Sequence, residues 1–353
     1  MKRVAVDANP LTRAAFTGTE VYLRELAPRL PAAGPEIEWV FYAGRPAPGA
    51  EVDLTVLPAP RLWSQARLPV ELWSRRPDLF FAPSHVVPYL APGRALTVVH
   101  DLAFERFPEA YRPIDRWYLR RTTRWALRRC PVVIAVSEST RRDLVELYDA
   151  DPERVVVVHS AATPPPRRLQ VRRARLAELG VAEPFALHVG RVEPRKNQAA
   201  ALAAVERVEG LTLVSAGPIA DVALAHRLLA SGRARVLGRV DAGDLELLYR
   251  SASALVFPSL YEGFGFPVLE AMLRGLPVVT VRSSSLPEVG GDAALYAEAP
   301  DDVDGLAGAL RSAVEDAAVR KRMVAAGRKQ AARFSWERTA AGVAEVIRGL
   351  LAR

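Results

Sequence analysis

The nine residues Glu262-Gly263-Phe264-Gly265-Phe266-Pro267-Val268-Leu269-Glu270 carry the clearest structural information in this chain. They follow an apolar run at 254–257 that is typical of a buried strand, and Pro267 suits the first position of a helix. Backbone N–H groups at a glycine-rich helix start can approach an anion closely, and the helix dipole favours negative charge there. The stretch therefore predicts a strand, a loop and a helix whose junction cradles a phosphate, with Gly263, Phe264 and Gly265 as the binding residues.

Two glutamates bracket this loop, eight positions apart. Glu270 falls in the first turns of the helix, where a carboxylate can accept hydrogen bonds from ribose hydroxyls, as acids do in dinucleotide sites. Glu262 lies on the loop itself, nearer to a sugar that would be attached to the phosphate. The structural alternative is a glycine turn followed by an ordinary carboxylate near a helix start.

Outward from this stretch, short apolar runs alternate with amphipathic segments. In the first half we expect strands at 3–7, 37–42, 78–82, 96–100, 132–136 and 155–158, and helices at 19–30, 112–129 and 138–148. In the second half we expect strands at 185–190, 211–216, 235–238, 254–257 and 277–281, helices at 197–208, 220–231, 243–252 and 267–274, and a last helix near 335–352. Strands separated by helices predict parallel, doubly wound α/β sheets.

The length of 353 residues suits two domains. Three consecutive prolines and an arginine-rich stretch interrupt the alternation at 159–184. We therefore expect an N-terminal domain over 1–162, a linker over 163–183 and a C-terminal domain over 184–334. Ligands commonly bind in the cleft between two such domains.

A second informative segment runs from Gly190 to Asn197, after the strand expected at 185–190. Arg191, Arg195 and Lys196 place two or three cations at a strand end, which suits a diphosphate and would neutralise charge on a departing group. Only four of the 48 basic residues are lysines, so a compact ammonium at Lys196 looks selected. An outward, solvated Arg195 and a merely basic strand-to-helix loop are the alternatives.

Two further segments follow strands of the first half. His100-Asp101 ends the strand expected at 96–100, and the carboxyl end of a parallel strand is where open α/β sheets bind ligands. A structural histidine and an Asp101 that caps the next turn are the alternatives. The segment Thr17-Gly18-Thr19-Glu20 lies between strand 3–7 and helix 19–30.

The stretch 262–270 resembles the E-x7-E motif of retaining glycosyltransferases of the GT-B fold, in particular glycosyltransferase family 4. The resemblance extends to Phe257-Pro258-Ser259-Leu260-Tyr261, Gly275-Leu276-Pro277-Val278-Val279, Leu286-Pro287-Glu288-Val289 and Gly291-Asp292-Ala293-Ala294. It implies two Rossmann-like domains facing across a cleft, with the donor held mainly by the second domain and the acceptor mainly by the first. It also implies that the last helix, 335–353, crosses back to the first domain.

The resemblance implies roles for individual residues. Arg191 and Lys196 would bind the donor diphosphate beside Gly190, and His100 would lie close to the transferred sugar or the acceptor. Gly18 would approach the donor phosphates from the first domain. Glu20 departs from the glycine- and arginine-containing versions of that loop, and an acid beside a diphosphate is unfavourable.

The implied reaction is transfer of a hexose, with retention of configuration, to a saccharide or lipid-linked acceptor in polysaccharide or glycoconjugate synthesis. No nucleophilic carboxylate stands out, which favours a front-face mechanism. The segments resemble bacterial mannosyl- and rhamnosyltransferases, so GDP-mannose is the first donor candidate, ahead of UDP- and dTDP-sugars. A nucleotide-sugar 2-epimerase of similar architecture and a non-catalytic sugar-nucleotide-binding protein are the alternatives.

Composition narrows the possible partners. The net charge of +8 suits a phosphate-bearing ligand, but no nucleic-acid-binding motif accompanies it. The single cysteine, Cys130, excludes an internal disulfide and fits a cytoplasmic location. Asp149-Ala150-Asp151 spells the metal-binding D-x-D of a different glycosyltransferase fold, but it precedes Pro152 in an apparent turn, so we expect neither a metal nor another cofactor.

One basic helix suggests a membrane contact. Within 112–129, arginines recur every fourth residue and aromatic residues lie between them, at Arg112, Arg116, Arg120, Arg124, Arg128, Trp117, Tyr118 and Trp125. Such a helix can lie on the anionic inner face of a membrane or hold a lipid-linked diphosphate. It can equally be a solvated face with its aromatic side chains in the core.

Overall fold

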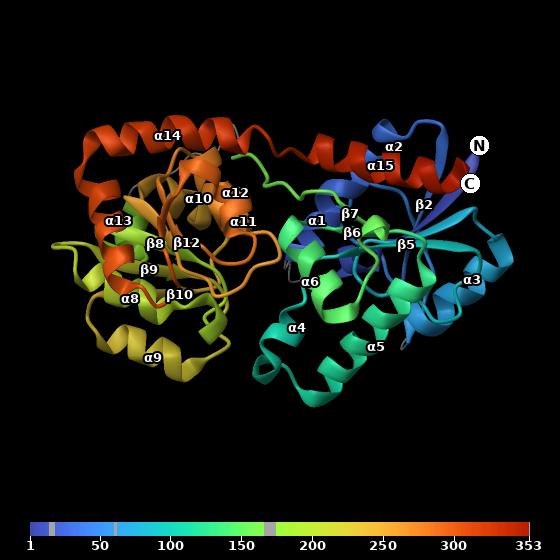
Figure 1. Ribbon diagram of the computed structural model, residues 1–353, viewed down its shortest axis with the longest axis horizontal. Coiled ribbons are helices and arrows are strands. Elements are labelled where there is room, and N and C mark those ends of the chain that lie inside the picture. Colours follow the sequence, from blue (N-terminus) through green and yellow to red (C-terminus); the bar gives the residue numbers. More distant parts are fainter. Residues whose placement is uncertain (14–17, 60–61, 166–173, 353) are drawn as a thin grey trace. The chain divides into compact units, whose positions relative to one another are not determined.

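The computed structural model describes residues 1–13, 18–59, 62–165 and 174–352. The chain forms two compact units (Figure 1). Unit 1 comprises Met1–Ala161 with Phe334–Arg353, and unit 2 comprises Ala162–Arg333. Each unit contains one parallel sheet with helices packed against it, which is the doubly wound α/β class that the sequence predicts.

Unit 1 is built on a seven-stranded parallel sheet in the order β3-β2-β1-β4-β5-β6-β7. Its strands are β1 (Lys2–Asp7), β2 (Ile37–Ala43), β3 (Leu54–Val56), β4 (Leu79–Ala82), β5 (Arg94–Val99), β6 (Val133–Ala135) and β7 (Val155–Val157). Its helices are α1 (Gly18–Leu26), α2 (Leu30–Ala33), α3 (Leu68–Arg75), α4 (Ala103–Arg106), α5 (Pro113–Arg129), α6 (Glu138–Tyr148) and α15 (Trp336–Ala352). The last helix, α15, packs beside α1 and α2 (Figure 1).

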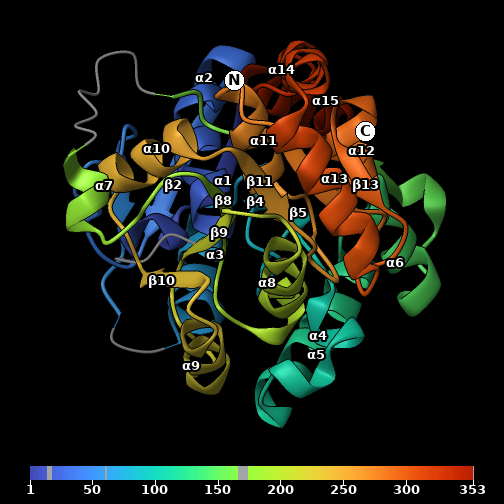
Figure 2. The same ribbon diagram turned by 90° about the vertical axis from the view of Figure 1, so that its left-hand side faces the viewer.

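Unit 2 has a six-stranded parallel sheet in the order β10-β9-β8-β11-β12-β13. Its strands are β8 (Phe185–Val189), β9 (Thr212–Ala216), β10 (Ala234–Gly238), β11 (Ala254–Phe257), β12 (Val278–Val281) and β13 (Leu295–Ala297). Its helices are α7 (Ala174–Glu178), α8 (Gln198–Glu206), α9 (Val222–Ala230), α10 (Ala242–Ser251), α11 (Phe266–Leu273), α12 (Leu286–Gly290), α13 (Val303–Glu315) and α14 (Ala317–Ala331). Helices α8 and α13 lie side by side against the sheet (Figure 2).

Four strands of the two sheets are buried along their whole length. Every residue of β4, β6, β11 and β12 is buried. A parallel sheet covered by helices on both faces requires this pattern, and it explains why these strands show no alternation in the sequence.

The structure differs from the sequence expectations at several places, and helices α3 and α4 of unit 1 were not expected. The helix expected at 19–30 is divided into α1, a 3-10 turn over Ala27–Arg29 and α2, because Pro28 and Pro31 each remove a backbone donor. Strands β3 and β13 are only three residues long at sheet edges, too short to show a pattern. The end of the expected linker belongs to unit 2, where Arg175 of α7 bonds Asp244 of α10. Residues 166–173 lie outside the described residues.

Strand order changes direction once in each sheet. In unit 2 the chain proceeds outward from β8 through β9 to β10, then from β11 through β12 to β13. In unit 1 the equivalent change lies between β1 and β4. Loops diverge at such a switch point, and the crevice they leave at the carboxyl ends of the strands is where open α/β sheets bind ligands.

Candidate active site

Two loops meet at the switch point of unit 2. The loop after β8 carries Lys196, and the loop after β11 carries Glu262. The Lys196 ammonium lies 2.6 Å from Glu262 Oε1, and both side chains are largely buried, at 12% and 11% exposure. The two residues lie 66 positions apart in the sequence. The structure thus brings together two residues that the sequence analysis assigned to one site.

Arg195 joins the same two loops. Its Nη1 donates to the Tyr261 carbonyl at 2.8 Å, its Nη2 donates to Glu193 at 2.9 Å, and its own carbonyl accepts from the amide of Leu260. Nη1 also lies 3.9 Å from Glu262 Oε2. The alternative of an outward, solvated Arg195 is therefore wrong, and this guanidinium holds the register of the loops.

The turn that presents Lys196 rests on a neutral histidine. His188 on β8 is fully buried, and its Nε2 lies 3.1 Å from the Lys196 carbonyl. Burial lowers the pKa of His188 to about 4, so the ring is neutral and donates to that carbonyl. Asn197 ends the turn in the left-handed conformation and donates to the Pro258 carbonyl, which again connects the two loops.

The Glu262 carboxylate is ionised in this setting. Burial alone would raise its pKa, but the positive charges of Lys196 and Arg195 outweigh burial and lower it. The Glu262 amide donates to Ser284 Oγ at 2.8 Å. Ser285 Oγ donates to the carbonyls of Glu262 and Phe264, so two serines from the loop after β12 shape the glycine-rich loop.

The start of α11 has the geometry that the sequence predicts. Gly265 adopts φ +101°, a left-handed conformation that suits glycine, and Pro267 lies in the first turn. Gly263 and Phe264 precede Gly265 on the same loop.

Arg191, on the loop after β8, is half exposed, unlike Lys196 and Arg195 of that loop. Its Nε lies 4.0 Å from Glu193 Oε2.

Glu270 lies one turn into α11. Its Oε2 accepts a 2.6 Å hydrogen bond from the hydroxyl of Tyr249 on α10. Burial raises the pKa of Glu270, and the Tyr249 bond and the charge of Arg274 oppose that rise. The sequence analysis missed both Tyr249 and Arg274. The only sign of them in the sequence was a tyrosine within α10 and an arginine just after α11.

In unit 1, His100 is held as a neutral ring. Its Nε2 donates to the Pro83 carbonyl at 2.8 Å, and its ring packs edge-on against Tyr22 with centroids 4.9 Å apart. Burial lowers the pKa of His100. Asp101 accepts from the amide of Ala103 at the start of α4, so the capping alternative describes what Asp101 does in this structure.

The start of α1 contains the remaining predicted residues. Gly18 begins this helix, and Thr17 lies outside the described residues. Glu20 is buried, and Arg13 Nη1 lies 2.5 Å from its carboxylate. Asp7, at the end of β1, was missed by the sequence analysis; it is buried beside the switch point of unit 1, between β1 and β4, and burial raises its pKa to about 6.

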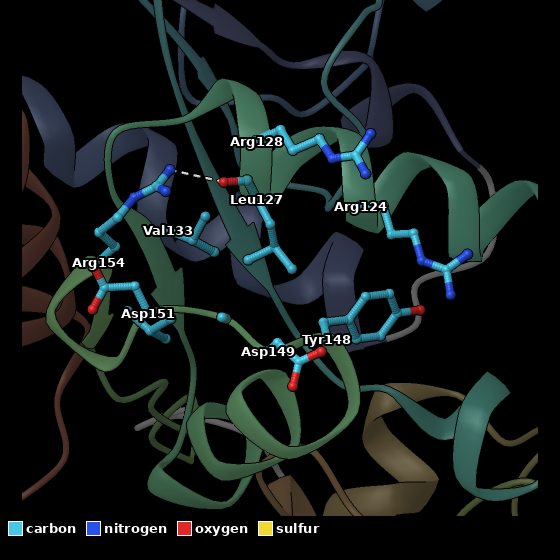
Figure 3. A pocket seen from close by; sticks show the side chains of 10 residues that line it. Arg124, Leu127, Arg128, Val133, Tyr148, Asp149, Asp151 and Arg154 are labelled. Atoms are coloured by element: carbon cyan, nitrogen blue, oxygen red, sulfur yellow. Dashed lines mark hydrogen bonds between the residues drawn. The ribbon is translucent and has the colours of Figure 1, made fainter.

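Unit 1 also has a pocket of about 400 Å³ at the amino ends of β6 and β7 (Figure 3). None of the predicted site residues lines it. Its wall includes the D-x-D segment, in which Asp149 ends α6 in the left-handed conformation and Asp151 accepts from the Glu153 amide. This is the turn chemistry expected from the sequence. Among the described residues, no cluster of three His, Cys, Asp or Glu side chains could hold a metal.

Helix α5 does not present its arginines as one basic row. Arg112 pairs with Asp115, and Arg116 and Arg120 both pair with Glu105. No helix in the described part of the chain has the length and apolar character needed to cross a bilayer.

Comparison with known proteins identifies the family. Residues 177–330 match the family described as glycosyl transferases group 1, and residues 16–163 match glycosyltransferase family 4. The chain is 35% identical to O-antigen chain mannosyltransferase B of Escherichia coli over 277 residues, 73% of this chain and 71% of that protein. The chain belongs to the group 1 glycosyltransferases.

Solved structures support the GT-B fold of this glycosyltransferase. Sucrose-phosphate synthase from Thermosynechococcus elongatus superposes with a TM-score of 0.76 at 20% identity, covering 100% of both chains. The Anabaena protein HepE, solved in complex with UDP-glucose, superposes with a TM-score of 0.75 at 18% identity, covering 99% of this chain and 100% of its own. The epimerase alternative is not favoured, because the matched families and the mannosyltransferase relative are transferases.

Proposed function

We propose that this glycosyltransferase moves mannose from GDP-mannose to a saccharide or lipid-linked acceptor, with retention of configuration and without a metal, in the cytoplasm. The observation that carries the proposal is the buried Lys196–Glu262 pair at the switch point of unit 2. The mannose assignment draws on the relative named as an O-antigen chain mannosyltransferase.

The geometry suggests how the charges would be used. An ammonium has three N–H donors, so Lys196 can keep Glu262 and still bind a diphosphate oxygen. Together with Arg191 it would stabilise the charge that develops on the departing diphosphate. Glu262, ionised and fixed, would accept hydrogen bonds from sugar hydroxyls. Glu270 would hold the ribose, and the neutral His100 would lie near the transferred sugar or the acceptor.

The proposed chemistry is a front-face exchange. The bond from the anomeric carbon to the diphosphate oxygen breaks, and the acceptor oxygen bonds that carbon on the same face. The acceptor proton passes to the departing diphosphate oxygen. No protein carboxylate is needed as a nucleophile.

The test is transfer by the purified chain with GDP-mannose and other nucleotide sugars, with the anomeric configuration of the product read by NMR. We expect a retained product, no loss of rate in EDTA, and near-complete loss of transfer in Lys196→Ala and in Glu262→Ala. Lys321→Ala and Glu298→Ala are matched controls, because both side chains are exposed in unit 2. Full activity in both site variants would reject the site, and donor binding without turnover would favour the non-catalytic alternative.

We further propose that the outer face of α5 contacts the anionic inner face of a membrane. Ile114, Trp117, Arg121, Arg124 and Arg128 recur at three- and four-residue intervals, so they share one face of the helix, and all are exposed. Trp117 and Ile114 are 54% and 63% exposed at one end of this face. The three arginines have no carboxylate partner among the described residues, and Figure 3 shows Arg124 and Arg128 extending to the same side of α5.

An exposed isoleucine and tryptophan beside unneutralised arginines fit an anionic lipid surface, because apolar groups enter the headgroup region while the cations meet the phosphates; a nucleic acid would leave the isoleucine unused. The test is co-sedimentation with phosphatidylglycerol vesicles and with phosphatidylcholine vesicles. We expect binding to the anionic vesicles alone, and its loss when the arginines of this face become glutamine. Equal binding by that variant would reject the proposal, as would DNA binding in place of vesicle binding. The control removes the same charge from exposed arginines of unit 2: Arg227→Gln, Arg239→Gln and Arg322→Gln.

A further inference from the structure

One tyrosine fixes the carboxylate of Glu270. Tyr249 is 1% exposed, and its hydroxyl lies 2.6 Å from Glu270 Oε2. The Arg274 guanidinium lies 4.9 Å from the centre of the Tyr249 ring and confines it. Burial raises the pKa of Tyr249 well above its ordinary range, so the phenol keeps its proton and remains a donor.

The surrounding contacts leave the other carboxylate oxygen available. Arg274 donates to the backbone carbonyl of Glu270 and to Glu246 Oε2, so its guanidinium is occupied away from the Glu270 carboxylate. Glu246 is in turn bonded by Arg250. Within the described residues, Glu270 Oε1 has no hydrogen-bond donor. A carboxylate anchored through Oε2 with Oε1 open is a preorganised acceptor for hydroxyl groups.

We propose that Tyr249 is a positioning residue that sets the ribose recognition of Glu270, and that the site therefore prefers ribonucleoside diphosphates to 2′-deoxyribonucleoside diphosphates. The inference rests on the proposed function, in which Glu270 holds the ribose. A ribose offers two neighbouring hydroxyl donors to the carboxylate, whereas a 2′-deoxyribose offers one. A site built to bond a hydroxyl rejects the analogue that lacks it, because the buried acceptor is left without a donor.

Tyr249 matters to this preference because an unanchored glutamate can turn between rotamers. The hydrogen bond from the Tyr249 hydroxyl holds the Glu270 carboxylate in one orientation before the ligand binds. The side chain therefore loses less conformational entropy on binding. Loss of this hydrogen bond should weaken the binding of ribonucleotides more than that of deoxyribonucleotides. Only a ribose donates two hydroxyl hydrogen bonds to the Glu270 carboxylate. The two nucleotide types should then bind with similar affinity.

The experiment measures dissociation constants by calorimetry on the full chain, for GDP, UDP and their 2′-deoxy counterparts. In the unmodified protein we expect the ribonucleotide to bind about tenfold tighter or more, the effect of one hydrogen bond to a charged group. In Tyr249→Phe we expect ribonucleotide affinity to fall about tenfold and the ratio to approach one. Tyr148→Phe is the matched control, because it removes a phenol–carboxylate bond of the same 2.6 Å length, to Glu105 in unit 1.

A pH profile separates positioning from general damage. The Tyr249 bond lowers the pKa of Glu270 against the effect of burial, so Tyr249→Phe should raise that pKa. Ribonucleotide affinity should then begin to fall at a higher pH in the variant than in the parent. An unchanged ratio and an unchanged profile in Tyr249→Phe would overturn the inference while leaving the proposed function standing. If the unmodified chain binds no nucleoside diphosphate, the inference about Tyr249 and the proposed function are both wrong.

Discussion

The Lys196–Glu262 pair gives a stability prediction that does not depend on any substrate. Lys196→Met removes the ammonium but keeps much of the volume of the side chain. Glu262 would then be a buried carboxylate whose nearest cation is Arg195, 3.9 Å away and already committed to Glu193 and the Tyr261 carbonyl. The variant therefore leaves a buried negative charge that the fold compensates only in part.

The magnitude follows from the burial of both side chains. Breaking a buried ion pair by removing one partner costs about 3–5 kcal/mol, and replacing both partners by neutral groups costs much less. Because Arg195 still offsets part of the charge, we take about 3 kcal/mol for Lys196→Met and about 1 kcal/mol for the double variant Lys196→Met with Glu262→Gln. For a unit of this size, a loss of 3 kcal/mol corresponds to about 6–12 °C in Tm.

Scanning calorimetry at several pH values tests both the size and the cause. The folded-state pKa of Glu262 is lowered, so the pair stabilises unit 2 above the ordinary glutamate pKa and loses that effect as pH falls through the folded value. In Lys196→Met the buried carboxylate should gain a proton more readily than in the parent. The Tm gap between parent and single variant should therefore narrow from pH 7 towards pH 4. Equal Tm values for the single and double variants, or a gap independent of pH, would refute the reasoning.

Three further outcomes follow from one closely packed glycine and two buried side chains. Gly217→Ala should destabilise unit 2 and weaken donor binding, because an added Cβ would lie 2.1 Å from the Gly190 carbonyl oxygen; urea unfolding and nucleotide titration would detect both effects. Cys130 is buried with its pKa raised to about 12 by burial, so iodoacetamide should label it only as fast as the chain unfolds. Burial raises the folded-state pKa of Asp7 to about 6, so this carboxyl lowers stability progressively as pH rises from the ordinary aspartate pKa to about 6, and by a constant amount above that value; Asp7→Asn should therefore raise Tm at pH 8 clearly more than at pH 4.

Element positions were largely accessible from the sequence because they depend on local patterns. The apolar runs that became β4, β6 and β11 are continuous, as buried parallel strands require, and the helices between them keep their polar faces. The short edge strands β3 and β13 were not accessible, since three residues such as those of β3 carry no period, whereas the equally short β7 was predicted from its run of valines. The π-helical turn at Trp63–Arg67 that leads into α3 was likewise missed.

Side-chain partners depend on tertiary register and were not accessible in the same way. Arg195 looked equally suited to solvent and to a ligand, and only the position of Tyr261 and Glu193 shows that it ties two loops together. Arginines at every fourth residue of α5 suggested one basic row along the helix. In the structure, Glu105 of α4 pairs with two of these arginines, Arg116 and Arg120, and neutralises them. The unneutralised face has a different spacing, and it could be recognised only once those pairs were known.

The meeting of Lys196 and Glu262 shows where sequence reasoning stops and topology begins. Each residue could be placed after the carboxyl end of a strand, but a sheet has several such ends. What brings these two together is the order β9-β8-β11-β12, which makes β8 and β11 neighbours although two strands separate them in the chain. The same order makes their junction the switch point, where the loops diverge and leave room for a ligand. At this junction the cation and the carboxylate therefore form a buried pair at the ligand-binding edge of the sheet.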